Sequence, residues 1–294
     1  MDHWSWPSYA KKTLNDGKFT DIDNLEGYCF PGYIGEQNFP LIPLNVLTHR
    51  FSGTLEADTR WCAGDDPSLF KKNKEKLGDA WHYSTKQIEY KVNANGYRAP
   101  EWNDIDWKEA VVILGCSMTF GVGVAEDETI SYLLQERLGR PVINIGYPAG
   151  SNEAIFNNSV SIFENFGCPA AVVTAWSTLD RFLFFSSYMH DIGLWTKDSA
   201  MVDGVELQKL YDFINLNQIN VQVKGYYLEK ANRSFWKDRT QYYSMSFFPS
   251  TAHYMRVDKY FTFTNTARDL IHPGVESNRE VAEHLFEVLK ERGL

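Results

Sequence analysis

The sequence has few cysteines, and they form no pairing pattern. Only four of its 294 residues are cysteine (Cys29, Cys62, Cys116 and Cys168), and no two of them make a C-x-x-C motif. Structural zinc sites and disulfide frameworks need cysteines at characteristic spacings. We therefore expect free thiols, as in a reducing compartment, and no metal site.

The sequence also lacks a long apolar run. No segment approaches the roughly 18 apolar residues that a membrane-spanning helix needs. The start, MDHWSWPSYAKK, has acidic and aromatic residues where a secretory signal has a basic start and an apolar core. We expect a soluble protein without a membrane span, and a cytoplasmic location rather than a secreted one.

Basic residues are in deficit. Lys and Arg number 29 against 38 Asp and Glu, which gives a net charge of −9, and no Lys/Arg run stands out. Binding to a nucleic-acid backbone depends on a positive surface, so nucleic acid is not an expected partner. No internal repeat is visible either, which disfavours a solenoid.

Aromatic residues are plentiful, at 15% of the chain, and many lie in residues 1–104. That region is turn-rich. The segment PSLFKKNKEKLG predicts a short helix ending at Gly78, and IEYKVNANGYRAP predicts an extended run, a turn at Asn95-Gly96 and a second short strand. We expect residues 1–104 to be an irregular region that packs on the next domain or forms a small accessory module.

Residues 105–294 alternate between strand and helix patterns. AVVIL (110–114) is a short β-branched run typical of a strand buried on both faces, and VINI (142–145) and AAVVTAW (170–176) predict the next two strands. The segments between them predict two helices, the first with Asp127 as its N-cap and Gly139 as its stop. This alternation predicts a three-layer α/β/α domain with a parallel sheet.

The last helix has its own signals. In HPGVESNREVAEHLFEVLKERGL, Ser277 and Glu280 fit a capping box and Gly293 fits the end of the helix. Residues 182–262 give only mixed helices and loops. The aromatic run at 235–263 fits a core or a partner interface better than the floor of a sugar-binding cleft.

Three groups suited to catalysis follow predicted strands or precede the last helix. Ser117 follows the first strand in GCSMTFG, Gly146 follows the second in NIGYPAGSN, and ARDLIHPG supplies Asp269 and His272. The carboxyl ends of parallel strands gather such groups at one sheet edge. A carboxylate three residues before a histidine reaches its imidazole, and the imidazole then activates a serine hydroxyl. The backbone N–H groups of Ser117 and Gly146 are candidate oxyanion donors.

The same residues have plainer interpretations. Ser117 fits a turn serine that caps a helix after a strand. His272 fits a loop histidine that is bonded to a carboxylate for structure alone. The combination of the serine block with the D-x-x-H-P block favours the catalytic interpretation.

The blocks GCSMTFG, NIGYPAGSN and DLIHPG, in this order, resemble the SGNH/GDSL hydrolase superfamily, whose members are flavodoxin-like α/β/α esterases and acyl hydrolases. The resemblance covers about residues 108–292. It implies Ser117 as nucleophile, His272 as base, Asp269 as its orienting acid and Gly146 as second oxyanion donor. VNANGYRAPEW also resembles a lead-in seen before such domains.

Two departures from the family pattern matter. Cys116 stands where the family has Asp, and WSTLD lacks the asparagine that is the family's third oxyanion donor. Removing one such donor typically costs about 100- to 1000-fold in rate. The candidates to replace it are Asn152, which we favour, the hydroxyls of Ser177 and Thr178, and Arg181. Asn152 equally fits an N-cap.

Arg181 has two interpretations. It fits an ion pair with Asp180 at the surface, or a pocket residue that binds an anionic or sugar substrate.

These residues predict a serine esterase that forms an acyl-enzyme on Ser117 and needs no metal or organic cofactor. The resemblance implies a small ester substrate, such as an O-acetylated carbohydrate or a short-chain acyl ester. Two alternatives stay open: a binding or structural protein of a larger assembly that has lost efficient catalysis, with the aromatic-rich regions as its partner surface, and an acyltransferase with the same triad.

Overall fold

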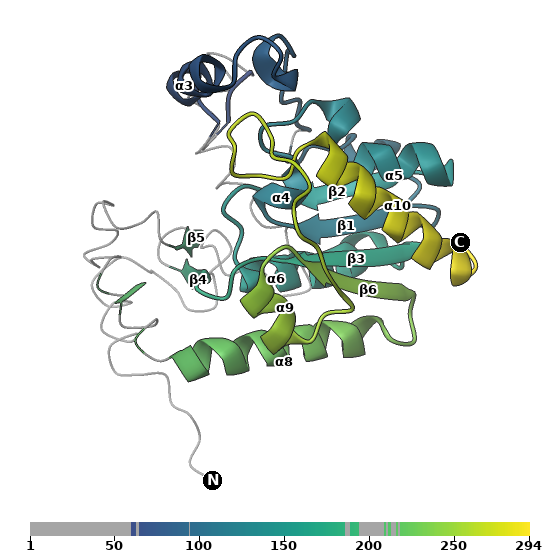
Figure 1. The fold of residues 1–294 in the computed structure, drawn as a ribbon. Helices are drawn as coiled ribbons and strands as arrows, with labels where there is room; N and C mark the ends of the chain where they lie inside the picture. The colour runs from purple at the N-terminus through teal and green to yellow at the C-terminus, as the bar shows by residue number, and fades with distance from the viewer. Residues whose placement is uncertain are drawn as a thin grey trace, which may run out of the picture.

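The protein is described from a computed structural model, which covers residues 60–62, 65–93, 95–185, 189–193, 209, 211–212, 216 and 218–294. Its centre is one five-stranded sheet in the order β2-β1-β3-β6-β7, and all neighbouring strands are parallel (Figure 1). The bounds of these strands are Val111–Gly115 (β1), Val142–Gly146 (β2), Ala171–Trp176 (β3), Gln241–Ser246 (β6) and Lys259–Tyr260 (β7). Strands β4 and β5 form a separate two-stranded sheet. When the five strands of the main sheet are numbered along the chain without them, their order is 2-1-3-4-5, which is the flavodoxin-like order. The expected α/β fold is confirmed.

Helices cover both faces of the sheet and make three layers (Figure 1). Alternate residues of β1 point to opposite sides, as the pleat requires. Val112 and Leu114 join one core with α6 (Asn152–Phe166) and α8 (Gln218–Trp236). Val111 and Ile113 join a second core with α5 (Ile130–Leu138) and α10 (Val275–Glu291). Burial on both faces explains the unbroken apolar run of β1 in the sequence.

The start of α5 differs from the prediction. Asp127 is not the N-cap, because it lies in a 3-10 turn, Glu126–Glu128. The Glu128 carboxylate accepts a hydrogen bond from the backbone N–H of Ala125 at 3.0 Å, which holds this acidic turn outside the helix. Thr129 caps α5 instead, and its hydroxyl accepts from the backbone N–H of Tyr132 at 3.2 Å.

The predicted capping box of the last helix is also wrong. Helix α10 begins at Val275, with Gly274 as its N-cap, so Ser277 lies inside the first turn. The Ser277 hydroxyl accepts from the backbone N–H groups of Thr264 and Asn265, at 2.9 and 3.0 Å. Glu280 accepts from the Thr264 hydroxyl. A tertiary contact with the preceding loop therefore takes both side chains that a capping box would use.

Part of the N-terminal region is described. The predicted helix is confirmed as α3 (Pro67–Leu77), and it ends at Gly78. The turn at Asn95-Gly96 is present, since the N–H of Gly96 donates to the carbonyl of Asn93, but the predicted second strand is wrong: residues 96–99 form bends. The backbone N–H of Asn93 donates to the carbonyl of Tyr97 at 2.8 Å and closes this turn. Residues 1–59, including Cys29, lie outside the described residues, and the division at residue 105 stays a prediction.

The segment that gave no clear pattern contains regular elements. It holds an antiparallel hairpin, β4 (Phe182–Phe185) with β5 (Met189–Ile192), then α8, β6, α9 (Pro249–Met255) and β7. Much of the aromatic run at 235–263 is core, because Trp236, Tyr242, Tyr243, Phe247 and Phe261 are buried. A partner surface made by aromatic residues stays a prediction.

Candidate active site

Ser117 stands on a tight turn between strand β1 and α4 (Ser117–Phe120). A Cβ on Gly115 would lie 2.0 Å from the Oγ1 atom of Thr119, so only glycine lets the strand pass this close beneath α4. Gly121 ends α4 in the left-handed region, at φ +82°. A strand-to-helix turn presents the nucleophilic serine in α/β-hydrolase enzymes. Ser117 is 6% exposed.

Asp269 and His272 form a hydrogen-bonded pair. The Oδ2 atom of Asp269 contacts the Nδ1 atom of His272, while its Oδ1 atom accepts from the backbone N–H groups of Ile271 and His272, at 3.0 and 3.1 Å. Leu270 takes a left-handed conformation, at φ +61°, which tightens the turn between them. Asp269 and His272 are both buried. With Nδ1 bound to the carboxylate, Nε2 is the ring nitrogen left for a substrate or a nucleophile.

The loop that carries Asp269 and His272 is bonded to the segment that follows the serine. The backbone N–H of Arg268 donates to the carbonyl of Gly123 at 3.0 Å. Gly123 takes φ +79°, and a Cβ there would lie 2.8 Å from the Cβ of Ala267 and 3.1 Å from the backbone nitrogen of Arg268. This contact joins the segment just after GCSMTFG to the residue just before DLIHPG.

Gly146, at the end of β2, lies against α4. A Cβ on Gly146 would lie 2.5 Å from the backbone nitrogen of Phe120, so the residue must be glycine for α4 to sit where it does. The N–H of Gly146 donates to the Oδ1 atom of Asn144 at 2.9 Å, and the Asn144 amide in turn donates to the carbonyl of Thr119. The assignment of Gly146 as an oxyanion donor stays a prediction, and it requires a substrate oxygen to replace Oδ1 of Asn144.

Asn152 ties the start of α6 to the end of β3. Its Nδ2 atom donates to the carbonyls of Ser177 and Thr178, both at 3.2 Å, and its Oδ1 atom accepts from the N–H of Ser177 at 2.8 Å. The N-cap of α6 is Ser151, so the capping alternative for Asn152 is wrong. Both amide hydrogens of Asn152 are thus engaged by the strand end.

The Ser177 hydroxyl is buried, and among the described residues it has no hydrogen-bond partner. Gly115 and Ala175 pair in the register of β1 and β3, so Ser117 and Ser177 stand two residues beyond paired positions on neighbouring strands. Neighbouring strands lie about 4.8 Å apart. Leu179, in the same WSTLD segment, packs against α8: a Cβ on Gly225 of α8 would lie 2.5 Å from the Cδ2 atom of Leu179.

Arg181 reaches the loop after β2, where its Nη1 atom donates to the carbonyl of Gly150 at 3.3 Å. Asp180 accepts a hydrogen bond from the Tyr211 hydroxyl at 3.0 Å. Asp180 and Arg181 therefore bond to different segments, and Arg181 lies beside the second of the three blocks.

Sequence reasoning missed a basic side chain that lies beneath the serine loop, residues 117–124. Arg98 is buried, and its guanidinium donates to the carbonyls of Gly121 and Val124, at 2.9 and 3.2 Å, and pairs with Glu126. Arg98 belongs to VNANGYRAPEW, the segment that resembles a lead-in to such domains. Asn93 accepts from the backbone N–H of Asn95 and of Tyr97, and this turn delivers Arg98 to the loop.

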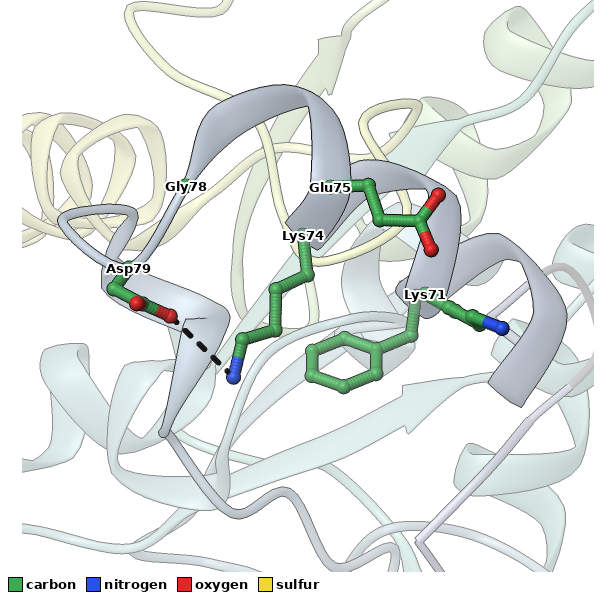
Figure 2. Close-up of a pocket in the computed structure, with 6 residues that line it drawn as sticks. Lys71, Lys74, Glu75, Gly78 and Asp79 are labelled. Atoms are coloured by element: carbon green, nitrogen blue, oxygen red, sulfur yellow. Dashed lines mark ion pairs between the residues drawn. The ribbon is translucent and has the colours of Figure 1, made fainter.

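A cavity of about 390 Å³ opens elsewhere, on the surface of α3 (Figure 2). It is lined by Phe70, Lys71, Lys74, Glu75, Gly78 and Asp79, and Lys74 pairs with Asp79 at 3.7 Å. None of the predicted site residues lines it, so it gives no support for a substrate site at Ser117. Across the described part of the chain, no three His, Cys, Asp or Glu side chains gather as a metal site would need. Within the same ranges, no helix combines the length and the apolar character that crossing a membrane requires.

Comparison with known proteins gives a fold likeness only. No family model matches the chain, and no curated protein matches it. Among solved structures, a lipolytic protein of the G-D-S-L family from Desulfitobacterium hafniense DCB-2 superposes at a TM-score of 0.40 with 11% identity, covering 61% of this chain and 99% of its own. An acetyl xylan esterase from the rumen bacterium Butyrivibrio proteoclasticus gives 0.38 and 11%, covering 63% and 64%.

A carbohydrate esterase family 2 enzyme with a carbohydrate-binding domain, from Corynascus thermopiles (Myceliophthora fergusii), gives a TM-score of 0.40 and 12% identity, covering 63% of this chain and 66% of its own. These scores and identities are too low to carry any conclusion about a site or a substrate. Each of these solved structures is similar to this chain over about three fifths of its length.

Proposed function

We propose that the protein is a serine esterase in which Ser117 is the nucleophile, His272 the general base and Asp269 its orienting acid. The observation that carries the proposal is the buried Asp269–His272 pair on a loop whose backbone is bonded to the serine loop. A serine hydroxyl reacts only when a neighbouring base removes its proton. An orienting carboxylate keeps that base in the reactive tautomer.

In the proposed reaction, Nε2 of His272 takes the hydroxyl proton as the Ser117 oxygen attacks the ester carbonyl. The tetrahedral intermediate collapses, the C–O bond to the alcohol breaks, and His272 returns the proton to the leaving alcohol. Water then attacks the acyl-enzyme while His272 takes one of its protons. The bond between the acyl carbon and the Ser117 oxygen breaks, His272 returns the proton to that oxygen, and the acid product leaves. His272 takes up and returns every proton that moves in these reaction steps, so the proposal includes no metal or organic cofactor.

Asp269 is suited to its role because its two carboxylate oxygens have different partners. Oδ1 is held by the backbone N–H groups of Ile271 and His272. These two hydrogen bonds fix the rotation of the carboxylate and leave Oδ2 for Nδ1 of His272. A fixed acceptor at Nδ1 holds Nε2 unprotonated and stabilises the imidazolium that forms during attack.

For the oxyanion we propose the backbone N–H of Ser117, the N–H of Gly146 and the hydroxyl of Ser177. Ser177 is favoured over Asn152 as the third donor, because both amide hydrogens of Asn152 are taken by the carbonyls of Ser177 and Thr178. A buried hydroxyl without a partner is costly for stability and is therefore a candidate for function. Asn152 then contributes by holding Ser177 in place.

The substrate that we propose is a small ester, such as an O-acetylated carbohydrate or a short-chain acyl ester. Arg181, beside the loop after β2, is the candidate contact for the sugar or for an anionic part of the substrate. Arginine suits this task because its planar guanidinium presents several donors at once. An acyltransferase would use the same triad and differ only in the acceptor of the acyl group.

The test is hydrolysis of 4-nitrophenyl acetate and of an acetylated xylose by wild type, Ser117→Ala and His272→Gln. We expect both variants to lose activity by at least about 1000-fold, with unfolding transitions like that of wild type. An added alcohol that captures the acyl group in preference to water would favour the transferase. Turnover retained by Ser117→Ala would contradict the proposal.

A further inference from the structure

We propose that Asp65 and Tyr90, both N-terminal to the α/β domain, are positioning residues that lock the Asp269–His272 loop onto the serine loop. The inference rests on the proposed function and adds to it a part of the chain that none of the three family-like blocks contains. It follows from a closed ring of hydrogen bonds through Asp65, Tyr90, Gly123 and Arg268.

The ring runs through both catalytic loops. The Tyr90 hydroxyl donates to Oδ2 of Asp65 at 2.5 Å, and the Arg268 guanidinium donates to both oxygens of Asp65, at 2.8 and 3.0 Å for the shorter contact to each. From the other side, the backbone N–H of Gly123 donates to the Tyr90 hydroxyl at 2.8 Å, and the backbone N–H of Arg268 donates to the carbonyl of Gly123 at 3.0 Å. Gly123 belongs to the serine loop, and Arg268 directly precedes Asp269.

The ring is sealed from water. Asp65 is 1% exposed, Arg268 4% and Tyr90 0%. The Arg268 guanidinium also lies over the ring of Trp61, 4.1 Å from its centroid, and 5.7 Å from that of Phe70 on α3. Burial, with the negative charge of Asp65, raises the pKa of Tyr90 well above its ordinary value, so its hydroxyl stays protonated as a donor.

Arg268 is held at its backbone as well as its side chain. Its N–H bonds to Gly123, and its carbonyl accepts from the Nδ2 atom of Asn73 on α3 at 3.0 Å. Figure 1 shows α3 beside the loop that leads into α10. With its N–H, its carbonyl and its guanidinium all bound, Arg268 leaves little freedom to the neighbouring Asp269.

A purely structural role for the ring is the competing explanation. Buried ion pairs contribute little net stability compared with apolar packing, although removing one partner is strongly destabilising. What the ring adds is a fixed separation between two catalytic loops, and misplacing a catalytic group by 1 Å costs about 100-fold in rate. A positioning role therefore predicts a loss of reactivity larger than the loss of stability explains.

The experiment compares Tyr90→Phe with Tyr242→Phe in the full chain. Tyr90→Phe keeps the aromatic side chain at position 90 stacked on Phe120 but removes the hydroxyl that joins Asp65 to Gly123. Tyr242 is also buried, and its hydroxyl also donates to a buried carboxylate, that of Glu229, so Tyr242→Phe is a matched control away from both loops. Arg268→Lys, which keeps the charge but loses the paired contact with Asp65, is the second test variant.

The readouts are the second-order rate of Ser117 labelling by a fluorophosphonate across pH, and hydrogen exchange of backbone amides in peptides covering 121–124 and 267–272. We expect Tyr90→Phe and Arg268→Lys to label about 10-fold more slowly than wild type or more slowly still, and to exchange faster in both peptides. Tyr242→Phe should stay within about twofold of wild type in labelling, as a control without a positioning role.

Two results would overturn the inference. One is a labelling rate in Tyr90→Phe equal to that of Tyr242→Phe, and the other is unchanged exchange in both loop peptides. If wild type itself is not labelled, the proposed esterase function fails, and the exchange comparison alone then decides whether the ring holds the two loops together. Should Arg268→Lys not fold, Tyr90→Phe carries the test.

Discussion

The backbone N–H of Arg268 donates to the carbonyl of Gly123 at 3.0 Å, which joins the loop before α10 to the loop after Ser117. The same Gly123 lacks a side chain where a Cβ would meet Ala267. Glycine at 123 therefore permits the close approach, and the hydrogen bond fixes it. The proposed catalytic arrangement depends on this junction.

Ser177→Ala should separate function from stability. Because the Ser177 hydroxyl is buried without a partner among the described residues, its removal should leave the free energy of unfolding unchanged or slightly raised. If the hydroxyl is the third oxyanion donor, kcat should fall by about 100-fold with little change in KM. Urea unfolding and steady-state hydrolysis measure the two quantities.

Asn152→Ala is the informative companion to that variant. It removes the amide that binds the carbonyls of Ser177 and Thr178, so the free energy of unfolding should fall by about 1 to 3 kcal/mol.

Full hydrolytic activity in Ser177→Ala, with a stable protein, would rule out Ser177 as an oxyanion donor.

Gly146→Ala should impair the serine turn. A Cβ at position 146 would lie 2.5 Å from the backbone nitrogen of Phe120, so α4 must move and take Ser117 with it. We expect labelling of Ser117 to slow by at least about 10-fold. The control is Gly139→Ala, at φ +64° with nothing within 4 Å, which should lose about 1 kcal/mol of stability from backbone strain alone. Equal labelling rates in the two variants would show that α4 tolerates the methyl group.

Arg98→Met should unfold more easily than wild type by about 3 kcal/mol, since it leaves buried carbonyls of the serine loop without a donor. Arg279→Met serves as the comparison, because Arg279 pairs with Glu276 at the surface of α10 and should contribute at most about 1 kcal/mol. Denaturant unfolding of both gives the difference. A change as small in Arg98→Met as in Arg279→Met would mean that the serine loop does not depend on Arg98.

Stability should fall below neutral pH partly through His284. Burial lowers the pKa of His284, Lys259 lowers it further, and Glu291 opposes the shift. Because the folded-state pKa lies below the unfolded value of about 6.5, the unfolded chain takes up the proton first. Stability from this group is present above that value and is lost as pH falls through the folded-state pKa.

The variant His284→Gln should therefore flatten the pH dependence of unfolding just below about pH 6.5. Thermal unfolding at several pH values measures it, and an unaltered slope in His284→Gln would contradict the assignment.

Strands β1, β2 and β3 were predictable because burial on both faces favours short, mainly apolar segments, and each of the three is one. Strands β6 and β7 lie in the segment that gave no clear pattern. The helix starts were less so. Thr129 and Asp127 are both good caps, and the choice between them depends on where the Glu128 carboxylate bonds. At Ser277, a contact with the 264–265 loop overrode a local capping motif.

Of the candidate site, the sequence indicated the serine and the Asp-His pair through short motifs. It gave no sign of the ring that surrounds them, since Asp65 and Arg268 are 203 positions apart and neither belongs to a recognisable motif. The partners of the Asn152 amide were hidden for the same reason. Contacts between distant segments depend on the finished fold, and a single sequence does not display them.

The most direct test is covalent labelling with a fluorophosphonate, followed by peptide mass spectrometry to locate the modified residue. The account predicts one phosphonylated residue, Ser117, with labelling abolished in Ser117→Ala and slowed at least about 1000-fold in His272→Gln. Modification at another residue, or none in well-folded wild type, would contradict it.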